Sequence, residues 1–572
     1  MSDNPAAADP VTVALTGMFP AMVLLAALLS YPVARWLLAL YHRSVGRGMQ
    51  ASSGASAQHA AQVPGRPPAT PLRIVDIPAA PGGGSDLAWL LEAPRRAGYV
   101  YAAAGAVYAL VMAVGWLVAS GIGLSVTRVA AIGWTYFWPT VLGVSLVATV
   151  ERSKWRLVGA YAAALAVLTL VAYAVSPDLH WHEMPVFWLL ENAVPTLLLA
   201  AFLSRRIRAV GPMVLAFMVL ALIGSQLPPL FLADDASIRA LAAAGGALGL
   251  GGVETFWAML LAGAGAFGVV GWWLLRWLGR RYEQKRITDH MLVTDALWLL
   301  FGITHSYTLA FHGWPWVFTG LLAFACFRLT RALGFRWLRA RPHPARRTLL
   351  LLRVFALGPR SARLFDVLQT HWLRLGDITM IAGPDLVTTT VEPHEFLAFL
   401  GGKLSRQFVE GRADLDQRLA RLDTERDVDG RYRVNEFFCR ADTWQMAMRE
   451  LAARSDAVLM DLRSFSPANR GCLFELGELL QGVDLERVVF VVDASTDRAF
   501  LEASLAELWT HVTPQSPNRR RGEACARIFD LAVRPTATRW HALLAALAGR
   551  RGETEPRPRG TMAETEPSGA AP

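Results

Sequence analysis

Long apolar runs dominate the first 340 residues of the chain. A bilayer core of about 30 Å requires roughly 20 mostly apolar residues in a helix, because backbone polar groups cannot stay unpaired in hydrocarbon. The runs that meet this test predict about nine transmembrane helices, near 11–29, 99–120, 130–150, 157–175, 185–203, 209–227, 256–278, 290–309 and 314–333. A further apolar stretch at 238–252 is short and glycine-rich, and it is compatible with an interfacial helix, a re-entrant segment or another span.

Basic residues fill alternate joints between these runs, and this alternation predicts the orientation of the chain. Lys and Arg crowd the joints after the first, third, fifth, seventh and ninth runs, whereas the other joints carry little beyond Arg128 and Arg239. Because short basic loops stay in the cytoplasm, we expect a multi-pass protein of the inner (plasma) membrane, with the lipid bilayer as its partner. Its amino terminus is expected outside and its carboxy-terminal region in the cytoplasm.

From about Arg347 the pattern changes to short apolar runs that alternate with amphipathic stretches. Strand-length runs lie at 349–357, 378–382, 457–462, 488–493 and 526–532, with a weaker one at 432–438. Continuous apolar strands separated by helices are typical of βαβ units and a parallel sheet. The predicted fold is therefore a multi-span α-helical membrane region followed by a cytoplasmic α/β parallel-sheet domain.

Composition divides the chain further. The segment between the first two apolar runs is rich in Ala, Ser, Gly, Gln and Pro, and the tail from Arg550 is rich in Pro and Glu. Both compositions are typical of disorder. The predicted regions are an outside tail with the first transmembrane helix (1–41), a disordered cytoplasmic loop (42–98), transmembrane helices two to nine (99–340), the cytoplasmic α/β domain (347–549) and a disordered tail (550–572).

Bulk composition and charge exclude simpler classes. A chain of 572 residues with 53% hydrophobic residues and a mean hydropathy of +0.33 is too long and too apolar for one soluble domain. The net charge of +10 comes mostly from the joints, so it predicts topology and no nucleic-acid partner. The four cysteines form no C-x-x-C pair, which favours a reduced environment and no disulfide framework.

Polar residues follow the carboxyl ends of the predicted strands, where open α/β sheets bind their ligands. Free N–H groups at helix amino termini and Arg side chains suit a phosphate there. The candidate nucleotide-binding residues are Gly358, Arg360, Ser361, Asp385, Arg463, Ser464 and Asp493. No G-x-G-x-x-G or Walker motif occurs, so neither a Rossmann site nor a P-loop is predicted, and no cofactor is expected.

The stretch 455–480 (SDAVLMDLRSFSPANRGCLFELGELL) contains the most specific candidate chemistry. An apolar strand ends in Asp461, and after a polar loop Ser466 can cap a helix with Pro467 at its first position. Glu475 then falls in the early turns of that helix, near the strand ends. A carboxylate close to a helix amino terminus also favours the helix through the macrodipole, and this purely structural interpretation stays open.

This stretch resembles two families of flavodoxin-like topology. In Toll/interleukin-1 receptor (TIR) domains, a strand and a Ser-containing loop precede a W-C-x-x-E-L helix; in nucleoside 2-deoxyribosyltransferase-like proteins, a strand ending in Asp precedes G-T-x-x-E-x-G. The helix here has the sequence GCLFELG (471–477), with Gly471 in place of the Trp of the first pattern and Cys472 in place of the Thr of the second. The resemblance covers about 349–508, and 391–442 resembles an insertion in either family.

The resemblance implies a TIR-like domain that binds a nucleotide and cleaves an NAD-type N-glycosidic bond, with NAD as a substrate. Glu475 would be the catalytic carboxylate and Asp461 would orient the sugar hydroxyls. It also implies a role in signalling or bacterial defence. Two other classes stay open: a non-catalytic membrane scaffold that self-associates through its cytoplasmic domain, and a transporter or channel with a regulatory domain. Glu191, Asp295 and His305 lie within apolar runs, where they would serve an ion or proton path or form hydrogen bonds between helices with Asn192, Thr294 or Ser306. No metal site is predicted, since the H-x-H-E stretch at 180–183 has no fourth ligand.

Overall fold

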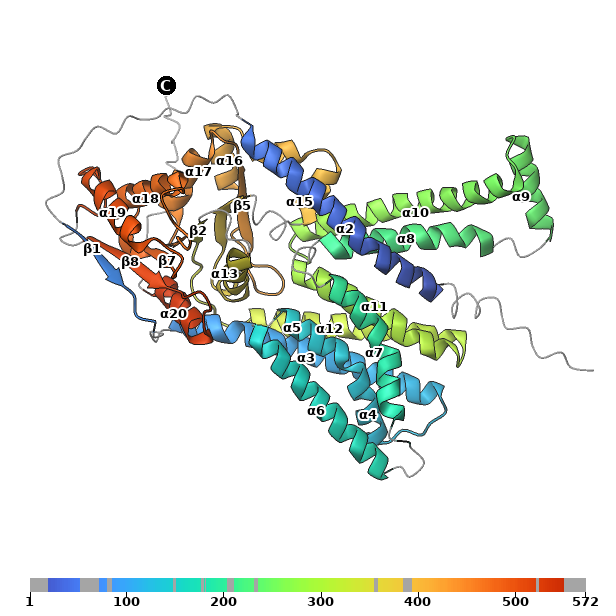
Figure 1. Ribbon diagram of the computed structural model, residues 1–572. Helices are drawn as coiled ribbons and strands as arrows, with labels where there is room; N and C mark the ends of the chain where they lie inside the picture. The colour runs from blue at the N-terminus through green and yellow to red at the C-terminus, as the bar shows by residue number, and fades with distance from the viewer. Residues whose placement is uncertain are drawn as a thin grey trace, which may run out of the picture.

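The computed structural model describes residues 19–51, 71–79, 85–147, 151–175, 180, 182–202, 210–230, 235–353, 359–383, 393–520 and 524–549. The chain is mostly helical, and its last third forms a parallel sheet covered by helices (Figure 1). The long helices gather in two groups on one side of that sheet region. One group holds α8 and α10 with α9 at their tip, and the other holds α3 to α7, α11 and α12 (Figure 1).

Each predicted span overlaps a long helix or a bent helix pair. The long helices are α2 (Phe19–Gln50), α3 (Ser85–Ala119), α6 (Glu151–Val175), α7 (Glu183–Phe202), α8 (Val210–Leu230), α10 (Gly252–Glu283), α11 (Asp289–Ala310) and α12 (Thr319–Arg339). Within the described residues, six helices are long and apolar enough to cross a membrane, and α4 (Val126–Tyr136) with α5 (Trp138–Val147), bent by 45°, makes up to seven. Since α7 and α11 do not meet that test, a count of about nine stays a prediction.

Two boundaries in this region differ from the sequence prediction. The first span candidate runs over Leu24–Gln50, because the apolar pattern continues past Leu29 through Trp36 to Tyr41. The glycine-rich stretch at 238–252 falls largely in α9 (Asp235–Ala247), whose 13 residues are too few to cross a bilayer. Of its three alternatives, the additional span is therefore wrong.

The sheet has eight parallel strands in the order β1-β8-β7-β6-β2-β3-β5-β4. The strands are β1 (Leu72–Asp76), β2 (Leu349–Arg353), β3 (Ile378–Ile381), β4 (Phe408–Val409), β5 (Val434–Cys439), β6 (Ala457–Asp461), β7 (Val488–Val492) and β8 (Ala524–Asp530). The continuous apolar runs form the central strands β2, β6 and β7, in which every residue is buried. The predicted parallel-sheet region is confirmed.

Helices cover both faces of this sheet. Because successive side chains of a strand point to opposite faces, Leu350 and Leu352 pack with α17 (Trp444–Arg454), α18 (Arg470–Gly482) and α19 (Arg498–Thr510). Leu349 and Leu351 pack on the other face with α13 (Pro359–His371) and α20 (Ala537–Ala548). Shorter elements complete this region, namely η3 (Trp372–Arg374), α15 (Pro393–Leu400), η4 (Leu404–Gln407), α16 (Arg412–Ala420) and η5 (Leu485–Arg487).

The prediction of a disordered loop over 42–98 is wrong for three parts. Helix α2 extends to Gln50, β1 pairs along its whole length with β8, and α3 begins at Ser85. The first turns of α3 bury Leu87 and Leu90 in the core of the sheet region. Averaged composition hid these elements, because the short LRIVD strand and the amphipathic start of α3 are flanked by Gly, Ser and Pro. Residues 52–70, 80–84 and the predicted tail 550–572 lie outside the described residues.

Ion pairs around buried Arg431 join α11 to the sheet region. Arg431 bonds Asp289 at 2.5 Å and Asp429 at 2.9 Å. Burial opposes ionisation of Asp429, but the charges of Arg431 and Arg374 outweigh it and lower the pKa of Asp429 to about 2. β5 begins three residues after Arg431, so these pairs fix one end of a strand whose other end borders the cavity described next.

Candidate functional site

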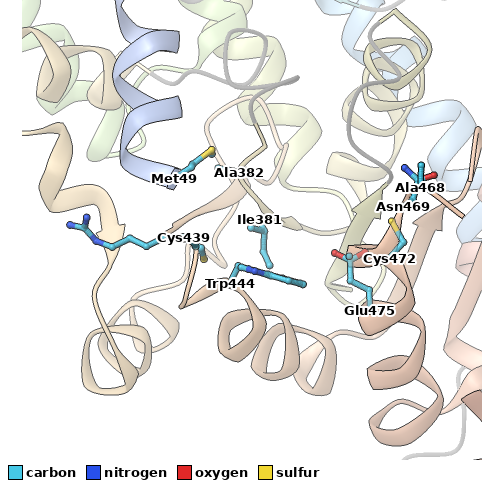
Figure 2. A pocket seen from close by; sticks show the side chains of 12 residues that line it. Met49, Ile381, Ala382, Cys439, Trp444, Ala468, Asn469, Cys472 and Glu475 are labelled. Atoms are coloured by element: carbon cyan, nitrogen blue, oxygen red, sulfur yellow. The ribbon is translucent and has the colours of Figure 1, made fainter. Parts of the chain in front are cut away.

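A cavity of about 330 Å³ lies beside the carboxyl ends of β3 and β5, between the first turns of α17 and α18. In Figure 2, Glu475 and Cys472 enter it from α18, Trp444 from the start of α17, and Met49 from the end of α2. The residues that line it are Met49, Ile381, Ala382, Cys439, Arg440, Ala441, Trp444, Ala468, Asn469, Gly471, Cys472 and Glu475. The most specific motif in the sequence thus opens into a real cavity.

Local interactions between β6 and α18 set the position of Glu475. β6 ends at Asp461, and Asn469 Oδ1 accepts hydrogen bonds from the backbone N–H of Ser466 at 2.9 Å and from its hydroxyl at 3.1 Å. This turn delays the start of the helix to Arg470, so Ser466 and Pro467 are not its cap and first residue as predicted. Glu475 is therefore in the second turn of α18, with Leu476 buried beside it.

Glu475 is a buried carboxyl without a full set of partners. Its side chain is 6% exposed, and Oε2 has no hydrogen-bond partner among the described residues. Burial raises its pKa to about 8, although the nearby charge of Arg353 at the end of β2 acts in the opposite direction. An acidic residue that serves only the helix macrodipole gains nothing from burial, because desolvation of the charge costs more than the dipole returns. The purely structural interpretation of Glu475 is thus disfavoured.

The two thiols of the cavity are poor nucleophiles. Burial and the charges of Glu475 and Asp461 raise the pKa of Cys472 to about 12, and burial raises that of Cys439 to about 12. Since the thiolate is the reactive form of cysteine, neither thiol can attack a substrate efficiently at neutral pH. Glu475 is the group of the cavity that is best suited to act on a ligand.

Asp461 lies outside this cavity, at the end of β6. It is fully buried, and Arg463 donates to its Oδ1 at 2.7 Å through Nε and to its Oδ2 at 2.6 Å through Nη2. Its strand neighbour at the same register is Arg353 of β2. A carboxylate held on both oxygens has little capacity left to orient a sugar, so its contacts with Arg463 account for its burial.

The other predicted residues form a polar network at the ends of β2, β6 and β7. Arg360 donates to Ser495 Oγ at 3.0 Å and lies 3.4 Å from Asp493 Oδ2. Ser464, which adopts a left-handed backbone with φ 61°, donates its N–H to the same Ser495 oxygen at 3.1 Å. Arg463 donates to the carbonyl of Arg360 at 3.3 Å. These residues therefore bond to one another, and none of them lines the cavity that contains Glu475.

Three predicted positions remain, and the structure describes one of them. Ser361 is buried near the start of α13, and its hydroxyl has no hydrogen-bond partner among the described residues. Gly358 and Asp385 lie outside the described residues.

Sequence reasoning missed several residues of the cavity. Trp444 is the first residue of α17 and Asn469 is the N-cap residue of α18, so a search of helix amino termini as well as strand ends can find them. Met49 lies more than three hundred residues earlier in the chain, and no local pattern connects it to the site.

Three polar residues within the long apolar helices are bonded between helices. Glu191 of α7 accepts from Thr308 of α11 at 2.8 Å, and Asp295 of α11 pairs with Arg331 of α12 at 2.5 Å. His305 of α11 bonds Tyr108 of α3 at 3.0 Å. These contacts bond the three predicted transport residues to neighbouring helices, but Oε2 of Glu191, which is 2% exposed, and Nε2 of buried His305 have no hydrogen-bond partner among the described residues, so the transport class stays a prediction. No group of three or more His, Cys, Asp or Glu side chains that could hold a metal ion occurs in the part of the chain that the structure describes.

No protein-family model, curated protein or solved structure matches this chain. The fold and the site define it as a membrane-associated protein with several apolar helices and a parallel-sheet region that contains a cavity lined by one buried carboxyl.

Proposed function

We propose that this protein is an integral membrane protein whose cytoplasmic, TIR-like domain binds a nucleotide in the Glu475 cavity and cleaves its N-glycosidic bond. NAD is the proposed substrate, and signalling or defence is the proposed role. The observation that carries the proposal is Glu475 itself, a carboxyl that is 6% exposed, has an unpartnered oxygen and borders a cavity of about 330 Å³. Small-molecule sites begin at roughly this volume.

The strand order supports a flavodoxin-like domain. Numbered along the chain, β2, β3, β6, β7 and β8 follow the spatial order β3-β2-β6-β7-β8, which is the order 2-1-3-4-5 of that fold. β5 and β4 extend it beyond β3, and β1 extends it beyond β8. The added strands near β3 contribute Cys439 and its neighbours to the cavity, so the insertion supplies one wall of the site.

The side chains around the cavity suit a ribosylated base. The indole of Trp444 offers a flat surface on which a base can stack. Cleavage would break the bond between C1′ of the ribose and the pyridinium nitrogen, and nicotinamide would leave with the electron pair as a neutral molecule. Glu475 would stabilise the cationic sugar, or bond to C1′ transiently, until a water oxygen bonds to C1′ and releases its proton to the carboxylate.

The raised pKa of Glu475 predicts that binding of a cationic substrate is coupled to loss of a proton. With its pKa raised to about 8 by burial, the carboxyl is mostly protonated at pH 7 in the empty cavity. A positively charged nicotinamide ribose beside it would favour the ionised form, so NAD⁺ binding would expel a proton. NADH, whose nicotinamide is neutral, would not do so.

The test is NAD consumption by the full chain in nanodiscs. Glu475→Gln keeps the shape of the side chain but removes the charge, and loss of such a group typically costs at least 10²-fold in rate. Glu478→Gln, on the same helix and paired with Arg449 at 2.6 Å, is the matched control and should retain activity. Equal NAD consumption by the wild type and Glu475→Gln would overturn the proposal. NAD binding without consumption by the wild type would favour the scaffold class.

A further inference from the structure

A second, smaller cavity lies where the membrane helices meet the sheet region. Its volume is about 30 Å³, which is room for about two water molecules. Helix α3 supplies Trp89, Ala93 and Arg96, and the end of α12 supplies Leu338 and Arg339. The remaining lining residues are His343, Arg374, Asp429 and Gly430.

Positive charge in this cavity exceeds negative charge. Arg96, Arg339 and Arg374 all line it, and Asp429 is the single carboxylate among its lining residues. Arg96 also pairs with Glu92 on the same helix at 2.7 Å and lies over the ring of Trp89, so a ligand would share this guanidinium with Glu92. That carboxylate already accepts from Arg431 at 2.9 Å through Nε. Burial lowers the pKa of His343, and the charges of Arg426, Arg374 and Arg96 lower it further, so three guanidinium groups act on one imidazole.

Arg374 gives an independent indication of a ligand. It is 8% exposed, and it donates to the backbone oxygen of Asp429 at 2.5 Å through Nη1, but its Nε has no partner among the described residues. Burial lowers the pKa of this guanidinium to about 10. A buried cation with an unused donor is costly, and an anion that accepts from Nε would remove that cost.

The position of the cavity indicates the source of the anion. The span candidate that contains α12 ends at Arg339. The span candidate of α3 runs over Asp86–Ala119, and Arg96 lies in it three residues before the apolar run that starts at Tyr99. Arg and Trp residues at span ends typically lie at the level of lipid headgroups. Basic pockets between spans at this level bind phosphorylated headgroups.

We propose that this cavity binds one phosphate group, supplied by the headgroup of an anionic phospholipid and held by Arg96, Arg339 and Arg374. Planar guanidinium groups bind phosphate oxygens in pairs of hydrogen bonds, which suits a site with three of them. Inorganic phosphate has the same chemistry, and the experiment below separates the two sources. This cavity shares no lining residue with the Glu475 cavity, so the proposed phosphate site does not depend on the proposed nucleotide cleavage.

The experiment uses the full chain in nanodiscs of phosphatidylcholine, with or without phosphatidylglycerol, and measures the thermal melting midpoint against the fraction of anionic lipid. The double variant Arg96→Gln/Arg339→Gln removes two exposed or half-buried charges of the cavity and spares buried Arg374. At roughly fivefold in affinity for each guanidinium, it should need about 25-fold more anionic lipid for the same rise in midpoint. The control Arg95→Gln/Arg336→Gln makes the same charge change on the same two helices, outside the cavity, and should behave as the wild type.

An equal loss of the lipid effect in both double variants would overturn the proposal, because it would indicate general attraction to an anionic surface. Absence of any rise with phosphatidylglycerol would overturn it too. A rise in phosphatidylcholine discs on addition of inorganic phosphate, absent in Arg96→Gln/Arg339→Gln, would support the phosphate site and assign it to a soluble anion.

Discussion

The buried carboxyl of Glu475 predicts that stability and pH are linked at this residue. Because burial raises its pKa from the usual 4.5 to about 8, the folded chain retains a proton that the unfolded chain releases. The contribution of Glu475 to stability is therefore complete below about pH 4.5, falls as the pH rises through 7, and is lost above about pH 8. Glu475→Gln, which cannot ionise, should escape that loss.

The expected magnitude follows from the size of the pKa change. The pKa moves from 4.5 to about 8, and each unit corresponds to about 1.4 kcal/mol, so ionisation costs the folded state on the order of 5 kcal/mol at pH 9. For a region of this size, about 1 kcal/mol shifts the melting midpoint by roughly 2–4 °C. About 1 kcal/mol of this is already lost at pH 5, so the midpoint of Glu475→Gln relative to the wild type should rise by about 8–16 °C between pH 5 and pH 9.

The assay is thermal melting of both proteins in nanodiscs at pH 5, 7 and 9. Other groups titrate equally in the two proteins, so the change in their difference with pH isolates Glu475. Glu478→Gln serves as the control, since it removes a carboxylate paired with Arg449 and should weaken the fold at pH 9. A difference between Glu475→Gln and wild type that stays constant from pH 5 to pH 9 would refute the reasoning, because the carboxyl would then not be buried in its protonated form.

Three further outcomes are expected. If the ionised carboxylate acts in cleavage, kcat/KM for NAD should increase about tenfold per pH unit below pH 8 and level off above it. Initial rates from pH 6 to 9 test this, and a flat profile would exclude Glu475 as the titrating group. Trp444→Ala should raise the Kd for NAD by about tenfold or more, and Trp444→Phe should retain most of the affinity, in equilibrium binding; equal loss in both would argue against stacking. Leu90→Ala should destabilise the sheet region by about 2–5 kcal/mol in thermal or denaturant unfolding. Leu110→Ala, at an exposed position of the same helix, should not, and equal effects of the two variants would contradict the packing of α3 on the sheet.

The sequence predicted the central strands well because their signal is local. A continuous apolar run such as AVLMD is buried on both faces wherever it lies in a parallel sheet, and β6 occupies Ala457–Asp461 as expected. The missed strands have no such signal. β1 is a five-residue edge strand whose partner β8 lies about 450 residues later, and β4 has only two residues, so pairing across the chain creates both.

The candidate site shows the same division. The motif around Glu475 identified the carboxyl that lines the cavity, because strand and helix amino terminus are adjacent in sequence. The list of strand-end residues was less informative about a ligand. Arg360, Arg463 and Asp493 have the right residue types at the right edge, yet they bond to one another and to Asp461. Residue type and position do not reveal which polar groups already have partners.

The domain boundary expected at Arg347 also needs a physical correction. The core of the sheet region includes Leu87 and Leu90, the indole of Trp89 donates to the carbonyl of Arg374 at 3.1 Å, and Asp86 pairs with Arg347 at 2.8 Å. A fragment that starts at Arg347 lacks these contacts and the β1 edge strand. Its exposed apolar surface would lower its stability, so activity measurements belong on the full chain.

Helix α2 connects the membrane region to the Glu475 cavity more directly than any charge pair does. Its last turns place Gly48 against the ring of Phe408 and Met49 in the cavity wall, and the N–H of Ala441 donates to the carbonyl of Ala51 at 3.3 Å. The same helix contains the span candidate Leu24–Gln50. One helical turn is about 5.4 Å, so an axial shift of α2 by a single turn would withdraw Met49 from the wall. A ligand that contacts Met49 would therefore stabilise the position of α2 seen here over a shifted one. By linkage, the observed position of α2 would strengthen binding of the ligand by the same factor.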